Sequence, residues 1–187
     1  MAGAGRLGAI NEPIRLHIGG RQRKRRWRIL DVRAEPGVDV VGSCTDLSAF
    51  ADGTVAEIYA SHVLEHLSHN QEIQRALIEM NRVLMPGGKL MLSVPDLDVL
   101  CRLFLDPALD IKQRFRVMRL MFGDHDHEHD VHKVGLSTEL IGHFIKHAGF
   151  AGMRRVRSFG LFRDTSELVL YGKPISLNLI VWKASKG

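Results

Sequence analysis

Side chains with acid–base capacity lie close together at positions 61–66. His62 and His66 are four residues apart, so a helix that begins early enough would place both rings on one face. An imidazole titrates near neutral pH, which suits it to exchange a proton with a bound molecule. Two histidines at this spacing can also hold zinc, but Glu65 precedes the second histidine rather than following the first, unlike the metalloprotease pattern. We expect either proton chemistry or helix capping from His62, a buried structural role for His66, and no metal.

A second group of candidates is the run Asp-His-Asp-His-Glu-His-Asp-Val-His at 124–132, which holds four of the ten histidines. Alternating histidine and carboxylate can coordinate a transition metal. However, neighbouring side chains in an extended loop point to opposite sides. The run therefore predicts a polar loop rather than a metal centre.

The segment around His62 predicts a strand, a helix and a second strand. Residues 56–60 form a short apolar run, and Ser68 with Gln71 predicts a capping box at the start of a helix. Pro86-Gly87-Gly88 ends that helix, and 90–94 reads as a buried strand. The apolar face of the helix consists of Ile73, Leu77, Met80 and Leu84.

This order predicts parallel strands, and ligands of such sheets bind beyond the carboxyl ends of the strands. Ser61, His62, Pro95 and Asp96 lie at those ends. The site is therefore expected there.

Residues 14–18 read as an earlier strand that opens onto Gly19 and Gly20. Glycines at such a place let backbone N–H groups approach a ligand without a Cβ in between. The next strand, predicted at 28–32, follows too soon for a standard parallel crossover of about a dozen residues or more. The first crossover is therefore predicted to be a very short helix or a loop, followed by a short strand at 38–41.

Two motifs resemble the class I S-adenosylmethionine-dependent methyltransferases, specifically the small bacterial type 11 group. They are Ala-Ser-His-Val-Leu-Glu-His-Leu at 60–67 and Arg-Val-Leu-Met-Pro-Gly-Gly-Lys-Leu at 82–90, in the family's order and spacing. The resemblance extends from Leu16 to about Phe150. It implies a Rossmann-like, doubly wound α/β fold: a mostly parallel, seven-stranded sheet with helices on both faces and the last strand antiparallel. It also implies S-adenosylmethionine as the cofactor.

The resemblance further implies which residues hold this cofactor. Arg21 stands where the family has a glycine, so its side chain either crowds the cofactor or pairs with the methionine carboxylate. Asp31 matches the acidic residue for the ribose, since a carboxylate accepts two hydrogen bonds from a cis-diol, but it could also cap the turn before Pro36. The implied contacts are Ile18, Gly19, Gly20 and Arg21 at the amino-acid end, Asp31 and Val32 at the ribose, Asp46 and Leu47 at the adenine, and Ser61 and His62 near the methyl group.

Methyl transfer is an in-line displacement at carbon, so positioning of the acceptor supplies most of the catalysis. A base is needed only when the acceptor is a hydroxyl or a protonated amine. His62 is the first catalytic candidate. The resemblance places the end of the 124–132 loop near the pocket mouth, which makes His132 the second.

The second half of the chain predicts helices at 97–105 and 111–122, which with the His-rich loop form a cover over the pocket (residues 97–135). Ser137 predicts the N-cap of an amphipathic helix that Gly149 ends. Strands are expected at 154–158 and 177–182, with an extra one at 168–171. The inward face of the amphipathic helix is expected to hold Leu140, Ile141, Phe144, Ile145 and Ala148.

The composition fits one domain over residues 1–187, with residues 1–12 as a flexible N-terminus; 45% of the residues are apolar. Cys44 and Cys101 provide no disulfide framework, which indicates a reducing, cytoplasmic location. No apolar run approaches the length of a membrane span, and the N-terminus lacks the apolar core of a signal peptide.

The net charge of +5 is concentrated in residues 21–28, where six of eight residues are basic. Such a run can bind nucleic acid, anionic lipid or a phosphorylated substrate, although a solvated basic loop is the simpler interpretation, because no aromatic residues interleave it apart from Trp27.

The sequence thus favours a methyltransferase acting on a small-molecule or saccharide-type acceptor. The alternatives are a cofactor-binding homologue without catalysis, motivated by Arg21, and a nucleic-acid-associated protein that uses residues 21–28. The sequence does not predict the oligomeric state.

Overall fold

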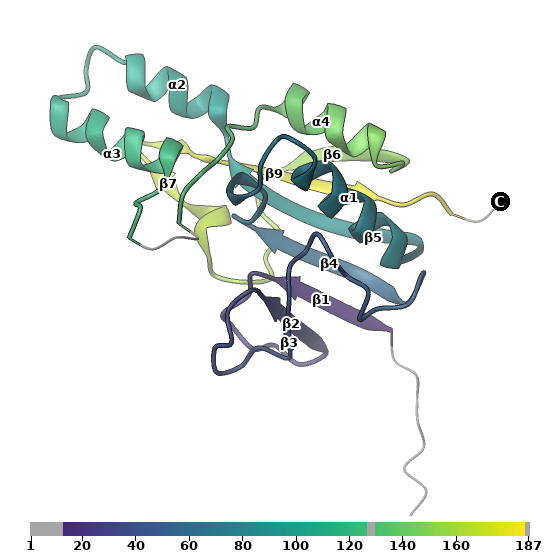
Figure 1. Cartoon of the computed structure of the whole chain (residues 1–187). Helices are drawn as coiled ribbons and strands as arrows, with labels where there is room; N and C mark the ends of the chain where they lie inside the picture. Colours follow the sequence, from purple (N-terminus) through teal and green to yellow (C-terminus); the bar gives the residue numbers. More distant parts are fainter. Residues whose placement is uncertain (1–12, 127–129, 186–187) are drawn as a thin grey trace, which may run out of the picture.

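A computed structural model of the chain describes residues 13–126 and 130–185. Its main feature is a seven-stranded sheet in the order β3-β2-β1-β4-β5-β9-β6 (Figure 1). Strands β1 to β5 pair in parallel, and β9 lies antiparallel between β5 and β6. The strands are β1 (Ile14–Ile18), β2 (Trp27–Asp31), β3 (Val40–Val41), β4 (Val55–Ser61), β5 (Leu84–Pro95), β6 (Gly152–Val156) and β9 (Ser176–Trp182). The predicted flexible N-terminus, 1–12, and residues 127–129 of the His-rich loop lie outside the described residues.

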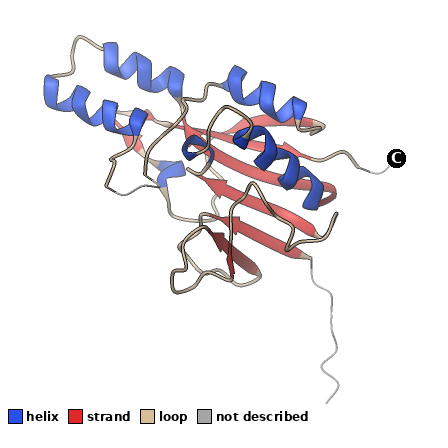
Figure 2. Cartoon of the chain, viewed as in Figure 1, coloured by secondary structure: helices blue, strands red, loops and turns tan. Residues whose placement is uncertain are grey.

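The helices follow the predicted order, and α1 and α4 lie over the same face of the sheet (Figure 2). α2 and α3 pack against each other at one end of the molecule, where Val117 is buried with Leu100 and Ile175. The predicted strand at 168–171 exists as β7 but pairs with β8 in a separate hairpin rather than joining the main sheet. These elements are α1 (Glu72–Val83), α2 (Leu97–Leu105), α3 (Ile111–Phe122), α4 (Thr138–His147), β7 (Val169–Leu170) and β8 (Lys173–Pro174), with short 3-10 turns η1 (Leu64–His66) and η2 (Thr165–Glu167).

The main core lies between the sheet and the pair α1 and α4. Leu16, Ile58, Leu90 and Val181 follow one another in register across β1, β4, β5 and β9, and each is fully buried. Burying one such side chain stabilises the fold by about 1.5–3 kcal/mol. This apolar layer fixes the strand register and therefore the positions of the strand ends.

The opposite face of the sheet is covered differently. The ring of Phe162, from the loop after β6, packs on Tyr59 with 4.8 Å between ring centroids, in a cluster with Trp27 and Met91. Further along this face, Glu57 pairs with Arg15 and Lys89 at 2.9 Å each, a charged row across three strands. The resemblance led us to expect helices on both faces, but a loop and charged side chains occupy the second.

The link between β1 and β2, residues 19–26, is fully described and contains no helix, as the short spacing predicts. Gly19 N–H donates to Leu30 O at 2.8 Å and so ties the start of this loop to the neighbouring strand. A loop rather than a helix therefore connects the neighbouring strands β1 and β2.

Two local predictions around α1 are wrong. Gln71 sits at the N-cap with φ 76° and no side-chain cap bond; instead, Glu72 Oε2 accepts from Ser68 N at 2.6 Å. The Pro86-Gly87-Gly88 turn does not separate helix from strand, because β5 begins directly at Leu84. The pairing shifts between Val55↔Leu84 and Glu57↔Lys89, so the turn forms a bulge inside the strand.

The helix α4 begins as predicted, with Ser137 Oγ accepting from Leu140 N at 3.3 Å. Ile141 and Ile145 are buried, but Leu140 is 48% exposed, so its predicted inward position is wrong.

Candidate functional site

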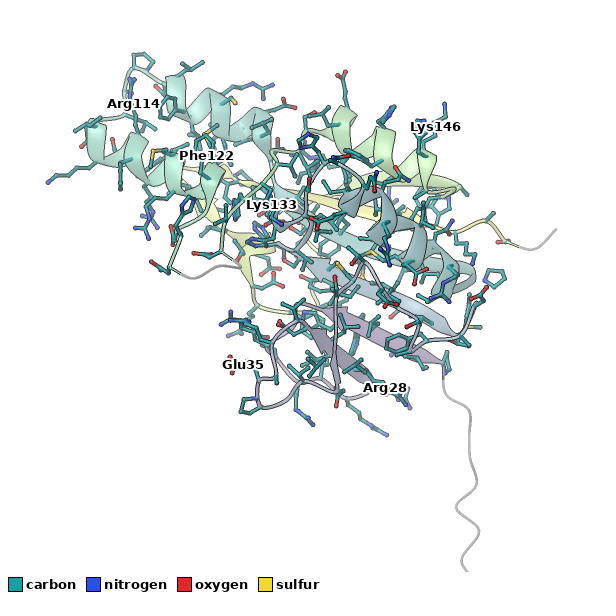
Figure 3. The ribbon with its side chains drawn as sticks, viewed as in Figure 1. Arg28, Glu35, Arg114, Phe122, Lys133 and Lys146 are labelled. Carbon is teal, nitrogen blue, oxygen red and sulfur yellow. The ribbon has the colours of Figure 1, made fainter. Side chains whose placement is uncertain are left out.

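A cleft of about 700 Å³ opens at the carboxyl ends of β1, β2 and β4. Residues 130–133 and 162–165 form part of its walls. Figure 3 labels Phe122, the last residue of α3, and Lys133, which lies between α3 and α1 in that view. The site thus joins the predicted strand ends to loops from the second half of the chain.

The glycines after β1 are required by their surroundings. Gly19 has φ +69°, and a Cβ there would lie 2.7 Å from Val63 Cγ2. A Cβ on Gly20 would lie 2.5 Å from the His17 ring. Ile18, Gly19 and Arg21 line the cleft, whereas Gly20 is buried against His17. Gly19 therefore presents its backbone to the cleft, whereas Gly20 faces the interior of the protein.

His17 is an unusual residue beneath this loop. Its ring packs 4.0 Å from that of Phe162 and 5.1 Å from that of Tyr59, measured between centroids. Burial lowers its pKa to about 4, and the carboxylate of Asp164 offsets only part of that effect. The ring is therefore neutral near pH 7 and acts as an aromatic support for the glycine loop.

Asp31 and Val32, at the end of β2, both line the cleft, as the sequence predicts. Asp31 is 8% exposed, and its Oδ1 accepts from Arg33 N at 2.8 Å and from Arg33 Nε at 3.4 Å. Val32 is half exposed. These contacts hold the Asp31 carboxylate at the strand end.

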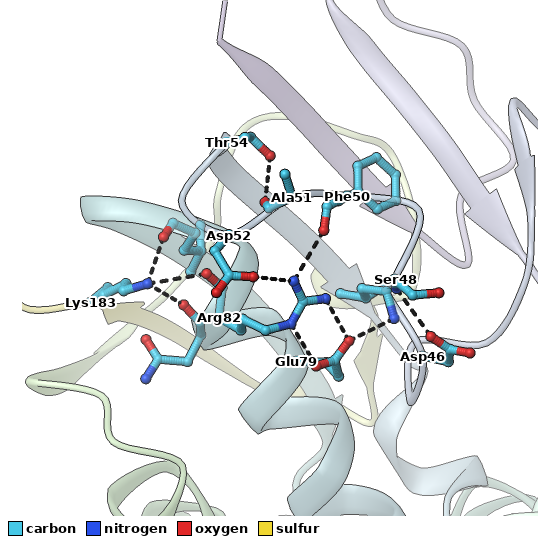
Figure 4. A network of polar contacts seen from close by, with 12 residues as sticks. Asp46, Ser48, Phe50, Ala51, Asp52, Thr54, Glu79, Arg82 and Lys183 are labelled. Atoms are coloured by element: carbon cyan, nitrogen blue, oxygen red, sulfur yellow. Dashed lines mark hydrogen bonds and ion pairs between the residues drawn. The ribbon is translucent and has the colours of Figure 1, made fainter.

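Asp46 and Leu47 lie outside this cleft, contrary to the sequence prediction. Leu47 is fully buried, and its N–H donates to Glu79 Oε2 at 2.9 Å. Asp46 is exposed and accepts from Ser48 N at 3.1 Å, beside a second groove along α1 (Figure 4). The hydrogen bond from Leu47 N to Glu79 holds this segment against α1. Arg82, which lies 2.7 Å from Glu79, keeps that carboxylate in place. Ser43 and Cys44 line the cleft in their place.

Ser61 and His62 line the cleft at the end of β4. His62 adopts φ +54°, a left-handed backbone conformation that residues other than glycine adopt uncommonly. Its Nδ1 lies 3.1 Å from Glu65 Oε1, and its Nε2 lies 3.0 Å from Ser176 Oγ. The ring is therefore oriented from both sides.

Glu65 is a buried carboxylate, only 1% exposed. Burial opposes its ionisation, but the neighbouring His62 and His66 rings outweigh that effect and hold the pKa of this carboxyl below its ordinary value. Glu65 is thus a negative charge placed directly behind the His62 ring.

His66 and His132 face each other across the same end of the cleft, with their ring centroids 4.9 Å apart. Burial lowers the pKa of His132, and the Glu65 carboxylate offsets part of that effect. The predicted pocket residue His132 is therefore brought to the site, next to the other candidate histidines.

Some residues of the site were not predicted from the sequence. Residues 162–165 follow no motif, and they are held at the cleft by contacts such as Gln22 Nε2 to Arg163 O at 2.5 Å, between residues 141 positions apart. Ser176 was not predicted either; it is 5% exposed and contacts His62 without lining the cleft itself. Asp96, expected at the strand ends, serves the fold instead: its Oδ1 caps α2 through Val99 N, and its Oδ2 accepts from Arg155 at 2.6 Å.

Comparison with known proteins agrees with this architecture. The family model described as "Methyltransferase domain" matches residues 21–92, which include the end of β4 and most of β5. The strand order, with one antiparallel strand inserted between β5 and β6, decides the fold. It is the class I methyltransferase fold.

Solved methyltransferases superpose over nearly the whole chain. A SAM-dependent methyltransferase from Thermotoga maritima has a TM-score of 0.58 at 18% identity, over 92% of this chain and 83% of that chain. One from Archaeoglobus fulgidus has a TM-score of 0.57 at 14% identity, over 92% and 87%. The CurJ carbon methyltransferase has a TM-score of 0.54 at 15% identity over 94% of this chain, which spans only 50% of CurJ. No sequence match was found among curated proteins.

The methyltransferase match implies S-adenosylmethionine as the cofactor. The cleft suits that molecule, because it offers glycine backbone after β1 and a fixed carboxylate after β2. Within the described residues, no helix combines the length and the apolar composition needed to cross a bilayer.

Proposed function

We propose that this protein transfers a methyl group from S-adenosylmethionine to a small-molecule or saccharide-type acceptor. The observation that carries the proposal is His62, held at the end of β4 between Glu65 and Ser176 and facing the same cleft as the glycine loop. A site with a cofactor cradle at one end and an oriented imidazole at the other suits group transfer.

The residues proposed to hold the cofactor all come from the ends of the first strands. The backbone of Ile18 and Gly19 approaches its amino-acid end, while Gly20 packs on His17 beneath the loop, and the Arg21 guanidinium pairs with its carboxylate. Asp31, beside Val32, accepts from the ribose hydroxyls. Ser43 and Cys44 take the adenine side, which the sequence had assigned to Asp46 and Leu47.

We propose His62 as the base on the acceptor side. Ser176 Oγ donates its single proton to Thr165 O at 2.8 Å, so it accepts from His62 Nε2–H. For base catalysis Nε2 must first release this proton, and an acceptor hydroxyl must replace Ser176 beside it. The acceptor's proton then passes to Nε2, and the Glu65 carboxylate beside Nδ1 stabilises the resulting imidazolium. The bound cofactor supplies an electrophilic methyl group on its sulfonium, and Ser61 and His62 lie where that group would be presented.

Calorimetric titration with S-adenosylhomocysteine tests the cofactor claim, with one site per chain as the expected result. A folded protein that gives no binding heat with either cofactor form would overturn it. The acceptor can then be sought in cell extract with labelled cofactor, fractionated by molecular size. Label that enters only fractions of macromolecular size would contradict a small-molecule acceptor.

A cofactor-binding homologue without catalysis remains the second candidate, because Arg21 lines the cleft where the family has a glycine. The nucleic-acid alternative has less support, since members of the basic run make intramolecular contacts: Lys24 donates to Leu161 O at 2.9 Å, and Arg23 lies 3.5 Å from Asp39.

We further propose a bacterial, cytoplasmic protein. Cys44 and Cys101 are free thiols, and burial raises the pKa of Cys44 to about 12, so this thiol stays protonated. Free cysteines fit a reducing compartment.

A further inference from the structure

Glu65, His66 and His132 bring metal-ligating atoms together at one end of the cleft. One ligand atom from each residue lies within 4.8 Å of the other two. Ligands at about 2.0–2.2 Å from one metal ion lie at most about 4.4 Å apart, so the three atoms must move slightly inward to hold an ion. The sequence predicted no metal at the His62 and His66 pair, and this set differs from that pair because His66 is joined by Glu65 and by His132, 66 positions away, rather than by His62.

Each member has an atom available for coordination. Glu65 Oε2 is buried and has no hydrogen-bond partner among the described residues, while Oε1 faces His62. His66 Nδ1 is engaged by Val131 O at 3.2 Å, which leaves Nε2 with its lone pair. His132 Nδ1 is likewise buried without a partner in the described part of the chain.

One of the two candidate histidines has the second hydrogen bond that metal-ligating histidines usually have. A ligating histidine commonly donates its other ring N–H to a backbone carbonyl, which fixes its tautomer and orientation. The Val131 carbonyl does this for His66.

The two segments that carry the ligands are also joined through the backbone. Lys133 N–H donates to Glu65 O at 2.7 Å, and His132 N–H donates to Phe122 O at 3.0 Å. The three side chains are therefore positioned by the fold and need no large rearrangement to converge on an ion.

We propose that Glu65, His66 and His132 bind one divalent transition-metal ion. Two imidazoles and one carboxylate suit zinc, iron(II) or cobalt(II) rather than magnesium or calcium, which prefer oxygen ligands. Three protein ligands leave at least one coordination position for a further ligand. If the proposed function holds, an oxygen of the acceptor would occupy such a position.

The test is a titration of the full-length, chelator-treated protein with Co²⁺, followed by visible absorption and by equilibrium dialysis with metal analysis. It uses neither cofactor nor acceptor, so its outcome is independent of the proposed function. We expect one ion per chain and a visible band that Zn²⁺ displaces. Glu65→Gln and His132→Ala should each lower the affinity about tenfold or more.

His147→Ala is the matched control. The His143 and His147 rings on α4 lie 4.1 Å apart and form another close histidine pair, outside the cleft. This variant should retain the band and the stoichiometry. Circular dichroism checks that each variant is folded. If Glu65→Gln unfolds, the metal affinity of His132→Ala decides the test, because His132 is only partly buried. Absence of stoichiometric binding, or binding lost in His147→Ala but kept in His132→Ala, would overturn the site.

Discussion

The two ends of the cleft are built in different ways. The proposed cofactor end comes mainly from residues 18–32, where strand ends and a glycine loop present backbone atoms, with Ser43 and Cys44 added after β3. The acceptor end is assembled by side chains from distant segments, such as His62 and Ser176, 114 positions apart. Backbone at a strand end is fixed by the sheet, whereas side-chain contacts between loops each depend on a single partner. Changes at the first end should therefore alter stability and affinity, and changes at the second should alter turnover.

The largest expected effect concerns His17, under the cofactor end. Its pKa is about 4 in the folded chain, below the ordinary value of 6.5, because burial excludes the charged form. The unfolded chain therefore takes up the proton first, so stability is complete above about pH 6.5 and decreases as the pH falls toward 4. The loss should reach about 3 kcal/mol. Urea unfolding at pH 7.5 and pH 4.5 measures it.

His17→Phe supplies the control, because a phenyl ring keeps the aromatic packing with Phe162 but cannot titrate. Between pH 7.5 and pH 4.5, the free energy of unfolding of His17→Phe should fall by about 3 kcal/mol less than that of the unmodified protein. An equal pH dependence in both proteins would show that other groups cause the loss.

The next largest effect is expected from His62→Ala at the acceptor end. Turnover should fall about 100-fold or more, the range of general base catalysis, while affinity for S-adenosylhomocysteine changes little. Kinetics with an identified acceptor, set beside calorimetry, measure both quantities. Ser176→Ala should have a smaller effect, because Ser176 leaves Nε2 when the acceptor binds. Full activity of His62→Ala would remove His62 from the mechanism and favour His132.

Asp31→Ala should show the reverse pattern. The loss of a carboxylate that accepts from the ribose should weaken S-adenosylhomocysteine about tenfold, the size of one charge-assisted hydrogen bond. At saturating cofactor, turnover should be largely retained. Unchanged affinity in calorimetry would indicate that Asp31 serves only to cap the turn through Arg33.

The smallest effect is expected from Arg21→Gly. If the guanidinium pairs with the cofactor's carboxylate at the exposed mouth of the cleft, the affinity should fall by a few-fold, because exposed ion pairs contribute about 1 kcal/mol or less. A large gain in affinity would instead mean that the natural loop is impaired, which favours the homologue without catalysis.

The difference between the two ends also explains what the sequence could predict. Apolar periodicity and the glycines located β1, β2, β4, α1 and the cofactor loop, because those signals act between neighbours in the chain. The position of Asp46 could not be read in this way, since it depends on Glu79 holding Leu47 N from another element. The Ser176 partner of His62 was missed for the same reason, because the antiparallel pairing of β9 with β5 places it.

The order of the strands has one further consequence, for how the molecule behaves among its neighbours. The sheet has two free borders, β3 and β6, and an unpaired border can recruit a strand from another chain. β3 has only two residues, and β6 carries the exposed Arg154 and Arg155 at its centre. A short border and a doubly charged one both discourage edge-to-edge aggregation. The two edges of the sheet thus oppose pairing with other chains, while the ends of β1, β2 and β4 line the cleft.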